Sequence, residues 1–211
     1  MSLNLWGRRG AWVKRRAVLR SGLRALHPDL VSFQEAIKTD EYDMVADLLG
    51  SEYHIVYQRH PESDGQSAVI ASRWPLEKVD EIDQRVSGRI DSAVTTLVAE
   101  LSLPAPFGPL LFVNHLPSWQ LNYEYERELQ SLAAARRIEE LVSERDLHVV
   151  VAGDLTDPPD SVSVRLLDGA SIAVRSQRLL SRRLGLAFSA PRLRARALRR
   201  PRRSHARHKE V

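Results

Sequence analysis

The chain has 211 residues, of which 43% are hydrophobic and 27% are charged, a composition typical of a globular protein with one substantial core. It contains no cysteine, which excludes disulfide bonds and thiolate metal sites. Its apolar runs have the length of strands and its start lacks the apolar stretch of a secretory signal, so we expect no membrane span and a cytoplasmic location.

The net charge of +4 conceals two parts of opposite sign. Residues 1–164 hold 17 Lys and Arg against 25 Asp and Glu, which is a net charge of −8. Residues 165–211 hold 14 against 2, which is a net charge of +12. The basic character therefore belongs to the tail, and it gives no reason to expect that the body of the protein binds polyanions.

The first half of the chain alternates helical and strand patterns. Residues 12–26 have apolar side chains at helical spacing with basic side chains outside that face, which predicts an amphipathic helix. Its apolar face is expected to consist of Trp12, Val18, Leu19, Leu23 and Leu26. A second helix is expected at 42–49, and strands are expected at 30–33, 53–57, 67–72 and 76–83.

The second half predicts strands at 91–103 and 110–113, a long helix at 123–145 and a strand at 147–152. Polar residues stand where apolar strands end, among them Glu35, His115 and Asp154. A carboxylate at the carboxyl end of a core strand sits where α/β folds place their ligands. Taken singly, each has an ordinary explanation as well, namely a surface Glu, a structural His and a turn-forming Asp.

Four short motifs occur along the chain in a fixed order. They are Asn4-Leu5-Trp6, Gln34-Glu35, Asn114-His115-Leu116 and Gly153-Asp154, the last continuing as Gly-Asp-x-x-x-x-Pro-x-Ser. Together they resemble the endonuclease/exonuclease/phosphatase superfamily, the deoxyribonuclease-like metal-dependent phosphodiesterases. The resemblance covers about residues 4–165.

The resemblance implies an α/β fold, a four-layer sandwich of two packed mixed β-sheets flanked by helices. Here the C-terminal strands would be missing or replaced. Residues 1–168 would form an incomplete domain of this type, and residues 169–211 would form a poorly ordered Arg-rich tail.

The resemblance also implies hydrolysis of a phosphoester by a metal-activated water. Glu35 would bind Mg²⁺, or Mn²⁺ as the alternative ion, with help from Asn4. Asp154 would orient or deprotonate the attacking water, and His115 would hold the phosphate. Substrates of the superfamily include DNA, RNA, phospholipids and small nucleotides, and the sequence has no feature that selects among them.

The sequence departs from the superfamily in two places. Thr156 takes the catalytic position where the superfamily carries Asn, and it offers a hydroxyl without the amide donor. Asp157 is the next residue, but its side chain is expected to point in another direction because it lies one position further along the chain. The Asp-His pair of the superfamily's last strands is also absent, and 12 of the 27 arginines lie in residues 170–211. A frameshift or an early end in a GC-rich gene would produce such a tail; the alternative is a real basic arm for nucleic acid or an anionic membrane.

Two rival interpretations remain open at the level of sequence. The protein could be an inactive relative that acts as a binding module, with the basic tail contacting nucleic acid or another polyanion. It could also be a fragment that barely folds because its sheets lack central strands. The sequence does not determine the oligomeric state.

Overall fold

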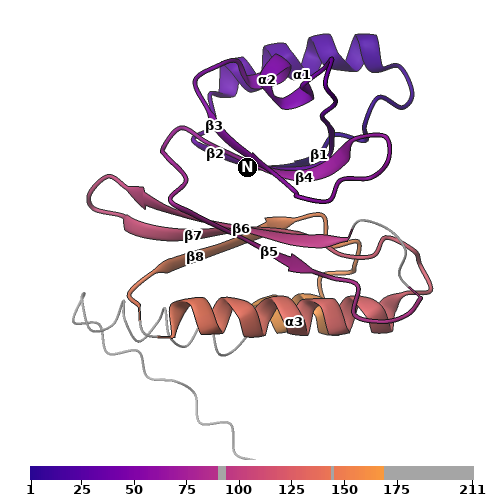
Figure 1. Cartoon of the computed structure of the whole chain (residues 1–211), viewed down its shortest axis with the longest axis vertical. Coiled ribbons are helices and arrows are strands. Elements are labelled where there is room, and N and C mark those ends of the chain that lie inside the picture. Colours follow the sequence, from indigo (N-terminus) through magenta and orange to yellow (C-terminus); the bar gives the residue numbers. More distant parts are fainter. Residues whose placement is uncertain (90–93, 144, 169–211) are drawn as a thin grey trace, which may run out of the picture.

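The computed structural model describes residues 1–89, 94–143 and 145–168. In this part of the chain, two four-stranded sheets pack face to face and helices cover their outer sides (Figure 1). The α/β sandwich expected from the resemblance is therefore confirmed. Residues 90–93 and the predicted Arg-rich tail at 169–211 lie outside the described residues.

Both sheets are mixed. The first has the order β1-β2-β4-β3, with β1 parallel to β2 and the other pairs antiparallel. Its strands are β1 (Ser2–Asn4), β2 (Leu30–Ile37), β3 (His54–Tyr57) and β4 (Gln66–Ser72). The second has the order β5-β6-β7-β8, with only β7 and β8 parallel. Its strands are β5 (Lys78–Asp83), β6 (Thr95–Leu103), β7 (Gly108–Leu116) and β8 (His148–Gly153).

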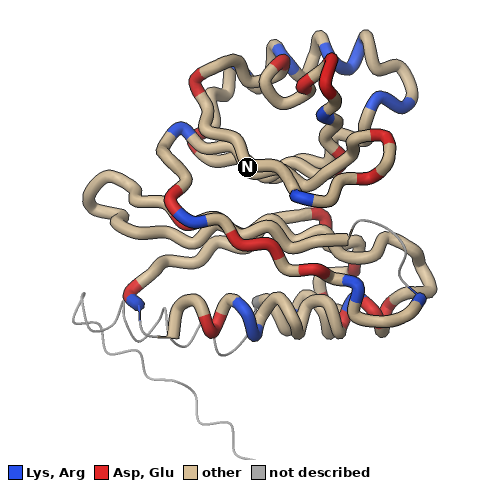
Figure 2. Tube along the Cα trace, viewed as in Figure 1, with Lys and Arg blue, Asp and Glu red and all other residues tan. Residues whose placement is uncertain are grey.

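Helices close the sandwich on both sides (Figure 1). α1 (Trp12–Leu26) and α2 (Met44–Leu49) cover the first sheet, and α3 (Glu124–Val142) covers the second. α4 (Val162–Asp168) packs against α3, and its first turn is capped by the Ser161 hydroxyl, which accepts the Val164 N–H at 3.2 Å. Lys and Arg gather along α1 (Figure 2). No helix among the described residues is long and apolar enough to cross a membrane.

The apolar core forms three layers between these elements. One lies between the first sheet and its helices, one between the two sheets, and one between the second sheet and α3. In β6, Leu97, Ala99 and Leu101 face the first sheet while Val98 faces α3. This is the alternation expected for a strand that is buried on both faces.

The predicted apolar face of α1 is only partly correct. Trp12, Leu19 and Leu23 pack on the core, whereas Val18 and Leu26 are exposed. An ion pair from Arg16 to Asp47 of α2 at 2.5 Å instead fixes the flank of the helix. Because α1 is an outer helix that touches its neighbours along a narrow stripe, a single row of apolar side chains suffices.

Two strands run further than their apolar residues indicate. The strand predicted at 30–33 continues to Ile37, and the strand predicted at 110–113 continues to Leu116. Backbone pairing is indifferent to side-chain polarity, so polar residues that were placed after the strands lie within them. Glu35 lies at an irregularity in the pairing of β2 with β4, between Phe33 and Ala36.

Candidate active site

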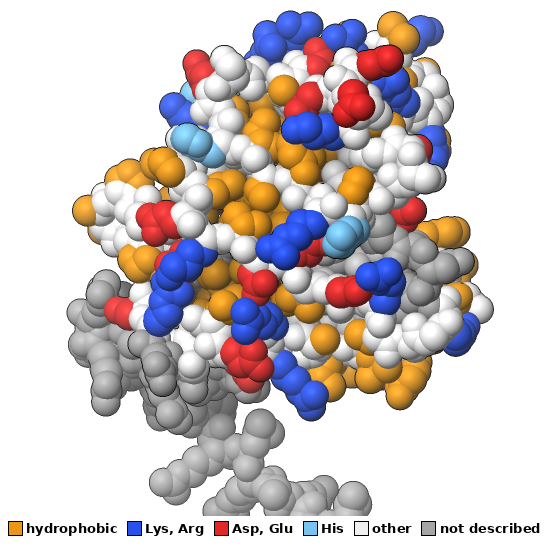
Figure 3. Space-filling view, viewed as in Figure 1, with side chains coloured by type: hydrophobic (Ala, Val, Ile, Leu, Met, Phe, Trp, Pro, Cys, Tyr) orange, Lys and Arg blue, Asp and Glu red, His pale blue; other side chains and the backbone are white. Residues whose placement is uncertain are grey.

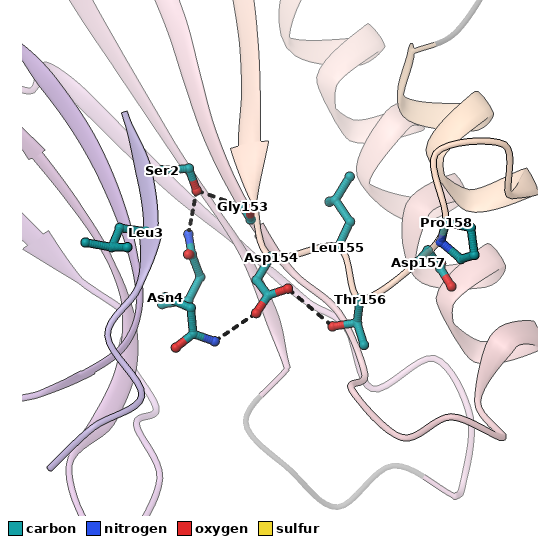
Figure 4. Close-up of a pocket in the computed structure, with 10 residues that line it drawn as sticks. Ser2, Leu3, Asn4, Gly153, Asp154, Leu155, Thr156, Asp157 and Pro158 are labelled. Carbon is teal, nitrogen blue, oxygen red and sulfur yellow. Dashed lines mark hydrogen bonds between the residues drawn. The ribbon is translucent and has the colours of Figure 1, made fainter. Parts of the chain in front are cut away.

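Asn4 connects the two carboxylates that the sequence motifs single out. It ends β1, and its Nδ2 atom donates to Glu35 Oε1 at 2.9 Å and to Asp154 Oδ2 at 2.8 Å. The three residues come from the ends of β1 and β8 and from the bulge of β2, far apart in sequence. The structure therefore assembles three of the four motifs at one edge of the sandwich, and Figure 4 shows the contact of Asn4 with Asp154.

The orientation of the Asn4 amide follows from a second contact. Asn4 Oδ1 accepts the backbone N–H of Trp6 at 2.8 Å, and only an oxygen can fill that role. The nitrogen therefore faces the carboxylates. In this arrangement Asn4 orients Glu35 and Asp154, and the metal-ligand role expected from the sequence stays a prediction.

Glu35 reaches the surface through an unusual backbone conformation. Its φ is 53°, in the left-handed region that a side chain with a Cβ rarely adopts, and the bulge turns it out of the strand pattern. Its Oε2 atom forms an ion pair with Arg9 at 2.8 Å, and 27% of its side chain is exposed. Glu35 is thus a solvent-accessible carboxylate whose charge is balanced by the long, exposed side chain of Arg9.

Gly153 is the residue that brings Asp154 to this edge. A Cβ atom at Gly153 would lie 2.0 Å from the backbone oxygen of His115, so no other residue fits without moving β7 or β8. The next residue, Asp154, donates its backbone N–H to the same His115 oxygen at 3.2 Å. Strand β8 is thereby held against β7 at the point where the carboxylate leaves it.

Thr156 lies beside Asp154, as the sequence predicts. Its hydroxyl is 3.5 Å from Asp154 Oδ1, at the outer limit of a hydrogen bond. Its φ is 54°, which is strained for a β-branched residue. Four non-glycine residues of the described chain have positive φ, and Trp6, Glu35 and Thr156 of these belong to this edge. Backbone strain of this kind is concentrated at functional sites in proteins.

His115 does not reach this edge, which corrects the position that the sequence indicates. Its side chain is fully buried within β7, with Nδ1 2.6 Å from Thr96 Oγ1 and Nε2 3.5 Å from Ser131 Oγ of α3. Burial lowers the pKa of His115 to about 4, and the nearby Asp157 charge offsets only part of that shift. The imidazole is therefore neutral at physiological pH, and its link to Asp154 runs through its backbone oxygen.

A buried set of polar groups surrounds His115, and the sequence analysis missed most of it. We call it the sealed network; its members are Gln84, Thr96, His115, Ser118, Arg127, Gln130, Ser131, Asp157 and Ser163. Its centre is the ion pair from Arg127 Nε to Asp157 Oδ1 at 2.7 Å, with side chains 5% and 2% exposed. An Arg inside the helical pattern of 123–145 reads as a surface residue, so no local signal reveals this pair.

Two hollows meet at Asp154 and Thr156, which line both. One has a volume of about 640 Å³ and includes Asn4 and the buried Gln34 in its lining (Figure 4). The other has a volume of about 590 Å³ and is lined in part by Glu35 and Arg9. We call Asn4, Glu35, Asp154 and Thr156 the open site, because each lines one of these hollows, whereas His115 lines neither.

The open site offers limited but suitable ligands for a hard divalent cation. Among the described residues no group of three or more His, Cys, Asp or Glu side chains is placed to hold a metal. Glu35 and Asp154 nevertheless present two carboxylates across one amide nitrogen. Mg²⁺ commonly binds one or two protein carboxylates and completes its shell with water and substrate phosphate, so this donor set fits such an ion.

Comparison with known proteins identifies the family of this chain. The model of the endonuclease/exonuclease/phosphatase family matches residues 1–205, a range that contains the whole of the expected 4–165. No protein with curated annotation matches the sequence.

Solved structures similar to this chain include TDP2 from Caenorhabditis elegans, with 21% identity and a TM-score of 0.63 over 76% of this chain and 48% of that one. The human Nocturnin catalytic domain with bound sulfate shows 14% identity and a TM-score of 0.62 over 78% and 65%. ANGEL2, a 2′,3′-cyclic phosphatase in complex with adenosine-2′,3′-vanadate, shows 17% identity and a TM-score of 0.63 over 78% and 51%. The aligned part of this chain thus spans about half to two thirds of these proteins, and at such identities the likeness concerns the fold.

Proposed function

Because the chain belongs to the endonuclease/exonuclease/phosphatase family, we propose that it is a metal-dependent phosphoester hydrolase that uses water as the nucleophile. The observation that carries the proposal is the contact of Asn4 Nδ2 with both Glu35 and Asp154. Two carboxylates joined by an amide and facing two open hollows form an arrangement suited to a cation and a water. The structural relatives, which include a phosphatase, support the same reaction class.

Each residue of the open site has a distinct role in this proposal. Glu35 would hold the divalent cation, Mg²⁺ or Mn²⁺, whose charge would stabilise the phosphoryl oxygens and the leaving group. Asp154 would orient or deprotonate the attacking water. Asn4 holds the two carboxylates at a fixed separation, and the Thr156 hydroxyl lies close enough to share the water. No covalent intermediate is required.

Arg9 adds an electrostatic component. It neutralises Glu35 through the 2.8 Å ion pair, and 55% of its side chain is exposed. A cation bound at Glu35 would replace Arg9 as the counter-charge, and the released guanidinium would then be available to a phosphoryl oxygen. The phosphoester could belong to nucleic acid or to a small molecule.

The test is hydrolysis of bis-p-nitrophenyl phosphate and of plasmid DNA by the full chain, with and without MgCl₂. We expect Mg²⁺-dependent turnover that falls by about 100-fold or more in Asp154→Asn and in Glu35→Gln, since general-base catalysis alone contributes about 10²–10⁴-fold. Asp40 and Glu41 are exposed carboxylates that follow β2 and line neither hollow, so they supply matched controls. Asp40→Asn and Glu41→Gln are expected to retain the full rate.

A second candidate is an inactive relative that binds phosphate-containing partners. The observations that favour it are the loss of the amide at Thr156, the occupation of Glu35 by Arg9 and the burial of His115. Absence of Mg²⁺-dependent turnover from a folded sample, with both MgCl₂ and MnCl₂, would exclude the hydrolase and leave this candidate.

A further inference from the structure

Two tryptophans stand exposed beside the open site. Trp6 is 51% exposed and Trp119 is 67% exposed, and both line the hollow of about 590 Å³ that contains Glu35 and Asp154. They come from the segment after β1 and from the segment between β7 and α3. Exposed apolar side chains that gather at one hollow are typical of a surface that binds a ligand.

Trp6 is held in place although its ring is half exposed. Its φ of 54° is a strained conformation for a bulky residue, and its backbone N–H is bound by Asn4. Its ring lies over Gly10, where an added Cβ would come within 2.9 Å of the ring atom Cζ3. The Arg15 guanidinium is 5.5 Å from the ring centroid. The strained backbone and the contacts with Gly10 and Arg15 thus hold the Trp6 ring in the lining of the hollow.

Trp119 is also placed by anchored backbone. Arg127 Nη1 donates to the backbone oxygens of Ser118 at 3.3 Å and Gln120 at 2.6 Å, one on each side of the tryptophan. The Ser118 N–H in turn donates to Gln130 Oε1 at 2.9 Å. The sealed network therefore fixes the main chain on both sides of Trp119 while the indole remains outside the core.

The rest of the hollow narrows the chemistry of its ligand. Apolar contacts from Val94, Leu116 and Pro117 accompany polar side chains such as Ser63, Ser67 and Gln66, a lining that suits a flat ring with polar edges. Glu35, Glu62, Asp64 and Asp154 bring four carboxylates against the single guanidinium of Arg9. That charge disfavours a polyanion with many phosphates, and on the face shown in Figure 3 acidic and basic side chains are interspersed.

We propose that Trp6 and Trp119 form a nucleobase subsite, and that the substrate is a small nucleotide with one phosphoester beside the base. Stacking of a base on these indoles would place the attached phosphoester against the carboxylates of the open site. The inference rests on the proposed hydrolase function for the fate of the phosphoester, but the subsite itself requires neither metal nor hydrolysis.

The experiment measures binding of adenosine to the full-length protein in EDTA by isothermal titration calorimetry, with ribose as the ligand that lacks a base. We expect saturable binding of adenosine and none of ribose. Trp6→Ala and Trp119→Ala should each weaken adenosine binding about tenfold, the loss expected for one base-stacking contact, and Trp119→Phe should weaken it less. Leu121→Ala and Tyr125→Ala, which remove exposed apolar side chains outside the lining of the hollow, should have no effect.

A second arm uses AMP and ribose 5-phosphate in the presence of MgCl₂. AMP should bind more tightly than ribose 5-phosphate in the unmodified protein, and the two should become alike in the Trp6→Ala/Trp119→Ala double variant. Adenosine binding that is absent, or that does not change in either tryptophan variant, would overturn the subsite even if hydrolysis is observed. Base-dependent binding without hydrolysis would instead refute the hydrolase and leave the subsite standing.

Discussion

The open site and the sealed network are neighbours that share one hydrogen bond, from the backbone N–H of Asp154 to the backbone oxygen of His115. The open site has few internal contacts, strained backbone at Glu35 and Thr156, and side chains that line solvent-accessible hollows. The sealed network has ordinary backbone, buried side chains and many short hydrogen bonds. The contrast indicates that different residues serve stability and reactivity at this edge of the sandwich. The sealed network supplies rigid support, and the open site supplies the groups proposed to react.

Arg127 is the residue of the sealed network whose loss should have the largest effect. Arg127→Met should lower the free energy of unfolding by about 3–5 kcal/mol, because it leaves the Asp157 carboxylate buried without its partner. Urea denaturation followed by circular dichroism would measure the change. The exposed Arg136→Met on the same helix is the matched control and should stay within about 0.5 kcal/mol of the unmodified protein.

A double variant sharpens this prediction. If the loss arises from the unpaired carboxylate, Arg127→Met combined with Asp157→Leu should be more stable than Arg127→Met alone. A double variant that is less stable by the full sum of both changes would show that Arg127 acts through its contacts to Ser118 and Gln120 instead.

A second prediction concerns pH. The pKa of His115 is about 4 in the folded protein and near 6.5 when the chain unfolds, so between these values only the unfolded state binds the proton. Stability therefore rises with pH across this window: the contribution is complete above pH 6.5 and is lost as pH falls toward 4. The size is about 3 kcal/mol, and denaturation midpoints at a series of pH values would measure it.

His115→Gln provides the comparison for that series. It keeps a neutral polar group between Thr96 and Ser131 but cannot titrate, so the slope of stability against pH between 4 and 6.5 should become shallower. An unchanged slope in this variant would assign the pH dependence to other groups.

The third and smallest prediction turns to the open site, where substitution should raise stability. Thr156→Asn should increase the free energy of unfolding by about 1 kcal/mol, because Asn tolerates the positive φ of 54° better than a β-branched residue. The added amide donor should also increase the rate of Mg²⁺-dependent hydrolysis. His27→Asn relieves the same conformation at the end of α1, and it should stabilise the protein without changing the rate. A destabilised Thr156→Asn protein would contradict the assignment of strain.

The fold was largely predictable because its strands and helices have clear periodicity. The helix at 12–26 and the buried strand at 67–72 match α1 and β4 closely, and the two faces of β6 follow simple alternation. Errors arose where the pattern ends before the structure does. Gln34 and His115 are polar, yet the backbone at these positions still pairs with a neighbouring strand, and Glu35 lies at the irregularity within β2. Side-chain pattern alone does not report the length of a strand in such cases.

The open site was partly predictable, and the sealed network was not. Asn4, Glu35, Asp154 and Thr156 were placed together by family motifs, and the structure brings them to one edge. His115 belonged to the same motif set but points toward α3, because adjacent residues of a strand face opposite sides and Asn114 faces Gln34 of the first sheet. Arg127 and Asp157 form their pair across tertiary structure, so the spacing of residues along the chain carries no trace of it.

The geometry of Gly153 has a consequence for mutational tolerance. The backbone oxygen of His115 would lie 2.0 Å from a Cβ atom at this position. A library randomised at residues 153 and 154 and selected only for folding should therefore retain glycine at residue 153 and accept many residues at 154. Selection for hydrolysis should then restore aspartate. The two letters of the Gly-Asp motif thus answer to different selective pressures, and a lineage could lose the second without disturbing the architecture that the first permits.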